Sequence, residues 1–575
     1  MIRMIKRIPL WSIVLCMVFA FMQGAFELYL PTLTAQIIDV GVKQGDVASA
    51  LSTGGRMLIV TVLIVMSAIF NVFIAARASQ NLGRQIRNEL YSQVLHFSKD
   101  SFEDFGSASL ITRASSDVQQ IEMTMVAVLR FMLLAPAMLV SAVVMAYRTS
   151  PELSMVYLFT IPILVVAIVF VMRAASPLFR SMQGKLDQIN LIFREGLTGV
   201  RVVRAFNRDE FEANRFEEAN ADFLHTAISA QIRVALLFPT LVGILSLTNM
   251  LIVWRGGQLV STETIQVGSI VAFTTFTAII MFSFMALAQM FILVPRASVS
   301  SQRVFEVLDK ENTIHNIEHP VTKQLEEPTT VTFDHVAYQY PGADDPVISD
   351  ISFTVKPGET LGIIGGTGSG KTTIANLILR FYDRTEGDIT INGQDIKDYE
   401  LKNLREIVGY VPQKANLFSG TIKSNLQYGN EHATDEEMWK ALDIAQATEF
   451  VGELEDGLDA RVEQGGSNFS GGQKQRLSIA RALVKQTTLY MFDDSFSALD
   501  ANTDAKLRRA LSEEMGEHTQ IYISQKASAV MHADKILVLD NGTVAGYGNH
   551  ETLMKESTVY REIVESQLKG MSDNE

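Results

Sequence analysis

The sequence is poor in cysteine and in charged residues. Cys16 is the single cysteine among 575 residues, and it lies within an apolar run. This count excludes a disulfide framework and a cysteine-ligated metal site. Only 19% of the residues are charged, and the net charge of −14 comes without a basic patch interleaved with aromatic residues. We therefore expect no nucleic-acid partner.

The apolar residues are distributed unevenly, and this divides the chain into two unlike parts. Long uncharged runs dominate residues 1–300, whereas the remainder mixes charged and apolar residues as a soluble domain does. A membrane-spanning helix needs about 20 apolar residues. Runs that meet or approach this length predict six transmembrane helices, at 8–26, 57–76, 123–147, 153–172, 234–254 and 264–295.

The first of these runs follows a basic start, residues 1–7, as in a signal peptide. The run is too long for one and lacks a convincing small-residue cleavage site, so we interpret it as a retained membrane helix. Glu27 and Arg130 fall within or near the spans, where an ionisable group is by default a functional hypothesis. Either side chain could instead reach the interface or a wet cavity without contacting substrate. The Met and Phe side chains of the sixth span have two interpretations. They could form an adaptable binding surface for substrates, or they could serve ordinary helix packing or lipid contact.

Lysine and arginine favour the cytoplasmic loops of a membrane protein. They are concentrated in residues 77–122 and 173–233, while the alternate loops are short and nearly free of them. This pattern predicts a cell-membrane protein with both termini and the soluble part in the cytoplasm. Apolar residues recur at helical spacing in both long loops, which predicts helices that continue out of the membrane.

The residues Gly365, Gly366, Thr367, Gly368, Ser369, Gly370, Lys371, Thr372 and Thr373 fit the pattern G-x-x-x-x-G-K-[ST]. An apolar strand-like run precedes this stretch and a helix-like run follows it, as a phosphate-binding loop requires. Small residues let successive backbone N–H groups point into one concavity at a helix N-terminus. Lys371 would reach the β- and γ-phosphates, and the Thr372 hydroxyl would bind Mg²⁺. The sequence thus predicts ATP and Mg²⁺ as cofactors.

Several further motifs resemble those of ABC exporters. Residues 102–118 and 199–210 look like the two intracellular loops of that family, which places coupling helices near 106–112 and 207–211. Residues 408–413 resemble its Q-loop, 469–473 its signature motif and 489–494 its Walker B strand. Ser497-Ala498-Leu499-Asp500 fits its D-loop. The resemblance covers nearly the whole chain.

The resemblance implies roles for individual residues. Tyr340 would stack on adenine, Gln413 and Asp493 would hold Mg²⁺ together with Thr372, and Asp500 of the D-loop would take part in nucleotide binding. Ser470, Gly471, Gly472 and Gln473 would close a nucleotide site formed on a second domain. Since the chain has one phosphate loop and no internal duplication, it should be half a transporter and must dimerise.

Two residues depart from the family pattern. The family usually places Glu where this chain has Asp494, and His where it has Gln525. Asp is one methylene shorter than Glu, so a general base at this position should activate water poorly. Glutamine can hydrogen-bond a phosphate but cannot change charge near neutral pH as histidine can. The chain's own site should therefore be degenerate, as in heterodimeric bacterial multidrug exporters, with Glu and His on the partner half-transporter. Gln464, where many members have Glu, fits the same subgroup.

The sequence thus predicts an all-α membrane domain of six helices at 1–300, a linker at 301–328, and an α/β P-loop ATPase domain with an antiparallel β portion at 329–575. The expected function is ATP-driven export of amphipathic compounds from the lipid bilayer as one subunit of a heterodimer. A homodimeric exporter, a lipid or peptide exporter and an ATP-regulated channel that does not transport stay open as alternatives. The sequence does not name the substrate or the partner.

Overall fold

The computed structural model describes residues 2–321 and 329–572. The chain divides into two compact units, the first spanning Met1–Leu95 and Ser107–Lys310, and the second His96–Gly106 and Glu311–Glu575. The predicted linker at 301–328 begins inside the last helix of the first unit, which runs to Leu308. Residues 322–328 of that linker lie outside the described residues.

The first unit is entirely helical. Within the described residues, six of its helices are long and apolar enough to cross a membrane, in agreement with the six predicted spans. The helical segments are α1 (Ile2–Ile5), α2 (Leu10–Gln36), η1 (Ile37–Val42), α3 (Val47–Leu95), α5 (Ser107–Thr112), η2 (Arg113–Asp117), α6 (Val118–Thr149), α7 (Pro151–Thr198), α8 (Val200–Ala205), α9 (Asp209–Ala235), α10 (Leu237–Ser261) and α11 (Val267–Leu308).

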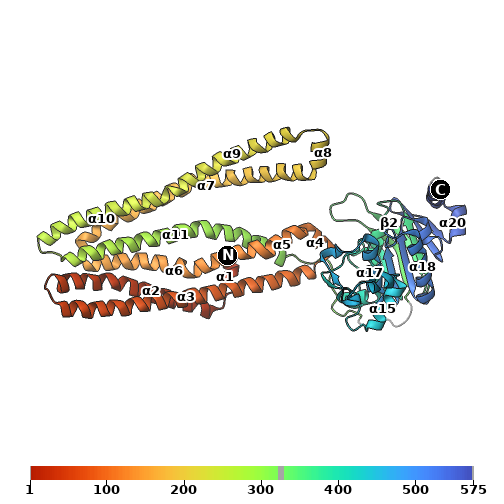
Figure 1. Ribbon diagram of the computed structural model, residues 1–575, viewed down its shortest axis with the longest axis horizontal. Helices are drawn as coiled ribbons and strands as arrows, with labels where there is room; N and C mark the ends of the chain where they lie inside the picture. The colour runs from red at the N-terminus through yellow and green to blue at the C-terminus, as the bar shows by residue number, and fades with distance from the viewer. Residues whose placement is uncertain (1, 322–328, 573–575) are drawn as a thin grey trace. The chain divides into compact units, whose positions relative to one another are not determined.

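The membrane helices extend well beyond their apolar runs. In α3 the buried face continues past the uncharged segment through Ser79, Leu82, Ile86 and Leu90, which recur every three or four residues. This spacing keeps one stripe of the helix packed while the charged residues stay outside, so the helix does not end where the hydrophobicity does. Figure 1 shows α7 and α9 running side by side, with the short helix α8 joining them at their tip.

Short helices lie at or next to both predicted coupling-helix positions. The first was expected at 106–112, where the structure has the short helix α5, and a further short helix, α4 (Lys99–Phe105), precedes it and belongs to the second unit. Ser98 caps its N-terminus by accepting a hydrogen bond from Ser101 N, and Gly106, with φ of 70°, ends it. Helix α5 itself belongs to the first unit. The second was expected at 207–211, where the structure has a turn and the start of α9, and the short helix is α8.

The second unit contains two larger sheets. One is antiparallel, in the order β2-β1-β4-β5, and the other has the order β12-β11-β3-β10-β9-β6, in which only β12 is antiparallel. This confirms the predicted α/β fold with an antiparallel portion. The strands are β1 (Val331–Tyr338), β2 (Ile348–Val355), β3 (Thr360–Gly365), β4 (Glu386–Ile391), β5 (Gln394–Asp395), β6 (Val408–Val411), β7 (Gly420–Thr421), β8 (Arg461–Val462), β9 (Leu489–Asp493), β10 (Thr519–Ser524), β11 (Lys535–Asp540) and β12 (Thr543–Gly548).

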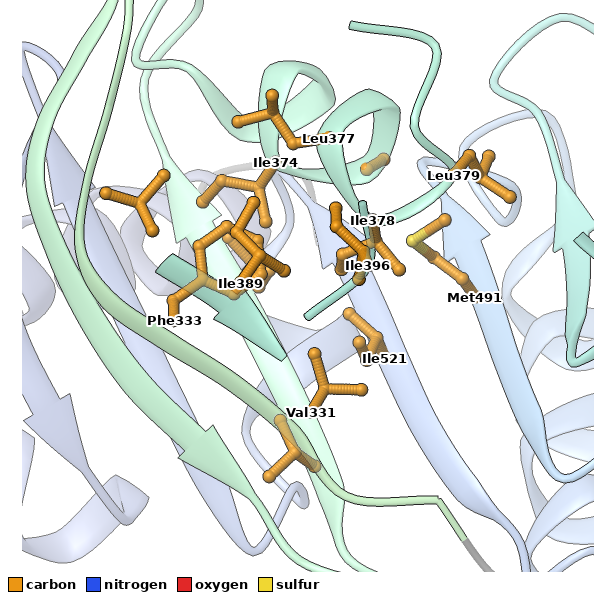
Figure 2. Close-up of a cluster of buried hydrophobic side chains, with 14 of the residues drawn as sticks. Val331, Phe333, Ile374, Leu377, Ile378, Leu379, Ile389, Ile396, Met491 and Ile521 are labelled. Carbon is orange, nitrogen blue, oxygen red and sulfur yellow. The ribbon is translucent and has the colours of Figure 1, made fainter. Parts of the chain in front are cut away.

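Helices flank these sheets and share their core. They are α12 (Lys371–Ile378), α13 (Leu401–Glu406), α14 (Ile422–Leu426), α15 (Asp435–Ile444), α16 (Thr448–Gly452), η3 (Gly457–Asp459), η4 (Gln464–Gly466), α17 (Gly471–Leu483), α18 (Ala501–Glu514), α19 (Ala527–Val530), α20 (His550–Glu556) and α21 (Thr558–Ser572). Figure 2 shows Phe333 of β1, Ile378 of α12 and Met491 of β9 in one buried cluster. Because α12 follows the predicted phosphate loop directly, this core holds the loop against the parallel sheet.

A buried acidic side chain joins two helices of the first unit. Glu122 of α6 forms an ion pair with Arg87 of α3, with Glu122 Oε1 2.9 Å from Arg87 Nη2. The carboxylate occupies the space left by Gly83, since a Cβ atom there would lie 1.5 Å from Glu122 Oε1. The glycine therefore permits α3 and α6 to approach closely around a charged group.

Candidate functional site

The predicted phosphate loop connects β3 to α12, as the sequence indicates. Gly368 and Gly370 have φ angles of 82° and 93°, in the left-handed region that glycine adopts without steric cost. A Cβ atom on Gly370 would also lie 2.3 Å from Ile348 Cγ2 of β2. Glycine is therefore required here both by conformation and by the close approach of the antiparallel sheet.

The side chain of Lys371 is folded onto its own loop. Its ammonium donates hydrogen bonds to the carbonyl oxygens of Gly365, at 2.8 Å, and Gly366, at 2.6 Å. Burial lowers the pKa of Lys371, while the nearby carboxylates of Asp494 and Asp493 raise it. The loop thus encloses a cation next to the cavity, where an anionic phosphate can take over these hydrogen bonds.

Asp493 lies at the end of β9, beside α12. Its Oδ1 is 3.4 Å from Thr372 Oγ1, which donates to it, and its Oδ2 is 3.5 Å from the hydroxyl of Tyr410 on β6. Burial raises the pKa of Asp493 to about 6. Tyr410 was not predicted as a site residue. The parallel register that sets Tyr410 opposite Met491 brings it here, and the sequence holds no direct signal of that register.

Asp494, directly after β9, has a left-handed backbone with φ of 46°. Its N–H donates to Ile523 O at 2.7 Å, which fixes the turn to the neighbouring strand β10. The Gln413 amide donates to Asp494 Oδ2 at 3.4 Å, and the Ser524 hydroxyl lies 3.5 Å from Asp494 Oδ1. The Asp494 carboxylate therefore has two polar neighbours, and it lines the same cavity as the phosphate loop.

These side chains line one cavity of about 230 Å³. The predicted residues that it brings together are Thr367, Gly368, Ser369, Gly370, Lys371, Thr372, Thr373, Gln413, Asp493, Asp494 and Gln525. Val347 and Ile523 also line it and were not predicted, since apolar side chains have no motif of their own. Tyr340, Asp500 and the residues 470–473 are not among its lining residues.

Tyr340 lies beside the phosphate loop. Its hydroxyl is 3.3 Å from Thr373 Oγ1, and its ring makes edge contacts with Tyr338 and Tyr382 at centroid distances of 4.9 and 5.3 Å. The half-buried ring is thus packed against other tyrosines of the domain, and its role toward adenine stays a prediction.

The segment 470–473 begins helix α17. The Ser470 hydroxyl accepts from Gln473 N at 3.3 Å, and the Gln473 side chain accepts from Ser470 N at 2.9 Å, which is a capping box. Asp500 similarly caps α18 by accepting from Thr503 N at 3.0 Å, and this bond lowers its pKa. A Cβ atom on Gly472 would meet Ala498 O at 3.3 Å, so the two segments lie side by side. Ser470, Gly471 and Asp500 are exposed, whereas Gly472 and Gln473 are partly buried.

Comparison with known proteins agrees with this arrangement. Residues 13–284 match the family model of the ABC transporter transmembrane region, and residues 348–497 match the family model described as ABC transporter. An uncharacterized ABC transporter ATP-binding protein of Mycobacterium tuberculosis is 40% identical over 544 residues, which cover 94% of this chain and 93% of the relative. The chain belongs to the ABC transporter family.

Two further similarities extend this assignment. A Bacillus subtilis relative, named a "Probable multidrug resistance ABC transporter ATP-binding/permease protein", is 31% identical over 95% of this chain and 93% of its own length. The solved structure of a bacterial Atm1-family ABC exporter with ATP bound matches with a TM-score of 0.77 at 23% identity, covering 96% of this chain and 97% of that one. This ABC transporter therefore has the fold of an exporter.

The family gives the two units their general functions. The first unit makes this ABC transporter a multi-pass membrane protein, and the second binds ATP and couples its hydrolysis to transport. Of the described cavities, the one around Lys371 has the composition of a phosphate site, with a cation, glycines and two carboxylates.

Proposed function

We propose that this ABC transporter is one subunit of a heterodimeric exporter of amphipathic compounds, with a degenerate ATP site of its own. The cavity around the phosphate loop supports this, because Asp494 and Gln525 both line it and, by the sequence resemblance, stand where the family usually has Glu and His. The multidrug resistance name belongs to the Bacillus subtilis relative, and we extend that substrate class to this chain.

The residues around Lys371 fit Mg²⁺ bound together with ATP. Thr372 and Asp493 supply the hard oxygen ligands that Mg²⁺ prefers, and Gln413 lines the same cavity. A Mg²⁺ ion held by these residues would supply positive charge next to the phosphates. Lys371 would bind the β- and γ-phosphates by exchanging its two carbonyl partners for phosphate oxygens.

Asp494 would be a poor general base. Its shorter side chain already accepts from Gln413 at 3.4 Å, and Ser524 lies 3.5 Å away, so the carboxylate is drawn to the wall of the cavity. A base must come within about 3.2 Å of the water that it deprotonates. ATP would therefore stay bound here for longer than at the second site, where the residues Ser470, Gly471, Gly472 and Gln473 of this chain would face the partner's phosphate loop.

Coupling would follow from closure of the two nucleotide domains on ATP, with Tyr340 stacked on adenine and Asp500 at the domain contact. The arginine-rich extensions of α3, α7 and α9 favour a cytoplasmic location for the second unit and both termini, in the cell membrane. The first unit would alternate between inward and outward access.

The deciding experiment is the ATPase rate of this chain purified alone and co-expressed with its candidate partner, in lipid, with and without a hydrophobic dye. We expect activity only with the partner and its loss when the partner's catalytic Glu is changed. An active dimer of this chain alone would refute the heterodimer and make Asp494 a competent catalytic residue.

A further inference from the structure

An open groove of about 620 Å³ lies between helices α7 and α10 of the first unit. Its walls are formed by large apolar side chains, among them Phe159 of α7 and Leu247 of α10, which are 69% and 63% exposed. A hollow with apolar walls of this kind can receive an apolar chain. On a helix pair that crosses a membrane, the surrounding apolar phase is lipid.

The floor of the groove has no polar group to offer a ligand. Thr160 and Thr248 are buried, and their hydroxyl oxygens lie 3.1 Å apart. Each hydroxyl is also within hydrogen-bond distance of a main-chain carbonyl of its own helix, Val156 O at 3.0 Å and Ile244 O at 2.7 Å. Because these hydroxyls already have partners within the protein, the floor suits a hydrocarbon chain.

One end of the groove is charged. Glu152, in the first turn of α7, and Arg255 of α10 both line it, and both are exposed. Arg255 donates one hydrogen bond, from Nη1 to Gln258 Oε1 at 2.9 Å, which leaves most of its five donors for a ligand. Across residues 2–321 and 329–572, no ion pair involves Glu152 or Arg255. Trp254, 65% exposed, lies beside them, as aromatic rings do at a membrane interface.

We propose that this groove binds one acyl chain of a glycerophospholipid with an ammonium-bearing headgroup. Arg255 would pair with the phosphate, Glu152 with the ammonium, and the chain would lie along Phe159 and Leu247. Two opposite charges at one end of an apolar channel match a zwitterionic headgroup with its tail. A protein occupant would have to bury both charges, which costs more than leaving them at a wet headgroup. The proposal is independent of the heterodimer and of the degenerate ATP site.

The same unit offers a matched control. A second groove of about 400 Å³, between α2 and α6, is lined by Tyr29, Val144 and Arg148, which brings a cation to it without a carboxylate. Arg148→Gln therefore removes one exposed positive charge from a groove whose lining has no carboxylate to pair with a lipid ammonium group.

Native mass spectrometry of the full detergent-solubilised chain, with equal amounts of phosphatidylethanolamine and phosphatidylglycerol, tests the proposal. We expect preferential retention of phosphatidylethanolamine and a fall in its occupancy of about tenfold in the variant Glu152→Gln/Arg255→Gln, as expected for lost charge-assisted contacts. Arg148→Gln should retain it as the parent does. The proposal would be overturned if the chain retained the two lipids equally. It would also be overturned if the double variant kept the parent's melting temperature and the parent's occupancy of phosphatidylethanolamine.

A second measurement separates lipid from protein as the occupant. In a Cys16→Ala background, Phe159→Cys places one thiol in the groove. We expect this thiol to react with a maleimide on a phospholipid chain and to be protected by excess phosphatidylethanolamine. A disulfide-linked dimer in membranes, with no lipid labelling, would show that a second copy covers the groove and would refute the lipid site.

Discussion

Gln413 and Asp494 lie just beyond the ends of two different strands and meet through one hydrogen bond, in which the glutamine amide donates to Asp494 Oδ2 at 3.4 Å. Gln413 follows β6 and Asp494 follows β9, which pair in parallel. The hydrogen bond therefore joins two residues that both line the cavity.

We expect Asp494→Glu combined with Gln525→His to raise the ATPase rate of this chain's own site. General-base catalysis contributes about 100-fold or more when the base is well placed, so a gain of at least about tenfold is the expected result. The measurement is the ATPase rate of the complex whose partner site has been inactivated.

The left-handed backbone at Asp494, with φ of 46°, requires a control, since aspartate adopts this region more readily than glutamate. The melting temperature of each single variant should therefore be compared with that of the parent. An unchanged rate in a well-folded double variant would leave the degenerate site without support.

Lys371→Ala should abolish tight ATP binding to the second unit. The variant removes the cation that now bonds to Gly365 and Gly366 and that a phosphate would engage. A charged hydrogen bond contributes about 1.5–3 kcal/mol, so the Kd for a fluorescent ATP analogue should rise at least about tenfold. Lys402→Ala is the matched control, because Lys402 is exposed and lies 3.9 Å from Glu406. Equal loss of binding in both variants would contradict a specific role for Lys371.

Gly83→Ala should destabilise the first unit. A methyl group there would lie 1.5 Å from Glu122 Oε1. Either the Glu122 carboxylate must move out of the space beside residue 83, or α3 must move away from α6. Overpacking of this kind costs about 1–3 kcal/mol, which thermal unfolding in detergent would detect. Gly54→Ala on the same helix meets no atom within 4 Å and should be neutral or stabilising. A parent-like melting temperature for Gly83→Ala would show that α3 and α6 are loosely packed.

Asp350 should make the stability of the second unit weakly dependent on pH. Its Oδ1 lies 2.5 Å from His335 Nδ1, and this hydrogen bond, with the charges of Asp350 and Asp334, raises the pKa of His335. A raised pKa in the folded state stabilises below the ordinary histidine pKa of about 6.5, and this contribution is lost as pH rises through the folded value.

The melting temperature of Asp350→Asn should therefore fall below that of the parent at pH 6 and converge with it at about pH 8. The difference should be small, because both groups are exposed. Asp344→Asn serves as the control carboxylate. A difference that grows as pH rises would contradict the assignment.

The sequence predicted the local features of this site better than its long-range contacts. The phosphate loop follows from the spacing of Gly365, Gly370 and Lys371, because its conformation is set by residues adjacent in the chain. The contact of Tyr410 with Asp493 depends on strand register, which the sequence does not state. The position of Tyr340 outside the cavity lining depends on its packing against Tyr338 and Tyr382.

The same distinction applies to the first unit. Six apolar runs predicted six helices, and the apolar spacing in the long loops predicted that helices continue out of the membrane, as α3 does through the buried Leu82 and Leu90. The residue at which each helix ends was not predicted. The assignment of α4 to the second unit could not be predicted either. It rests on contacts such as that of the Ser98 hydroxyl with Thr313 Oγ1 at 2.9 Å, far apart in sequence.

Helices α3 and α7 have nearly equal lengths, 49 and 48 residues, but proline occurs inside only one of them, which gives them different mechanical properties. At 1.5 Å per residue, the 49 residues of α3 span about 74 Å, more than twice the roughly 30 Å hydrocarbon core of a bilayer. Helix α3 contains no proline, so its backbone hydrogen bonds are not interrupted by one and we expect it to move as a stiff rod. A tilt of about 5° of such a rod would displace its far end by about 6 Å. Helix α7 contains Pro162 and Pro177, each of which removes a backbone hydrogen bond and creates a point of bending. A push on α3 is therefore transmitted along its whole length, while α7 can absorb part of the same movement as curvature.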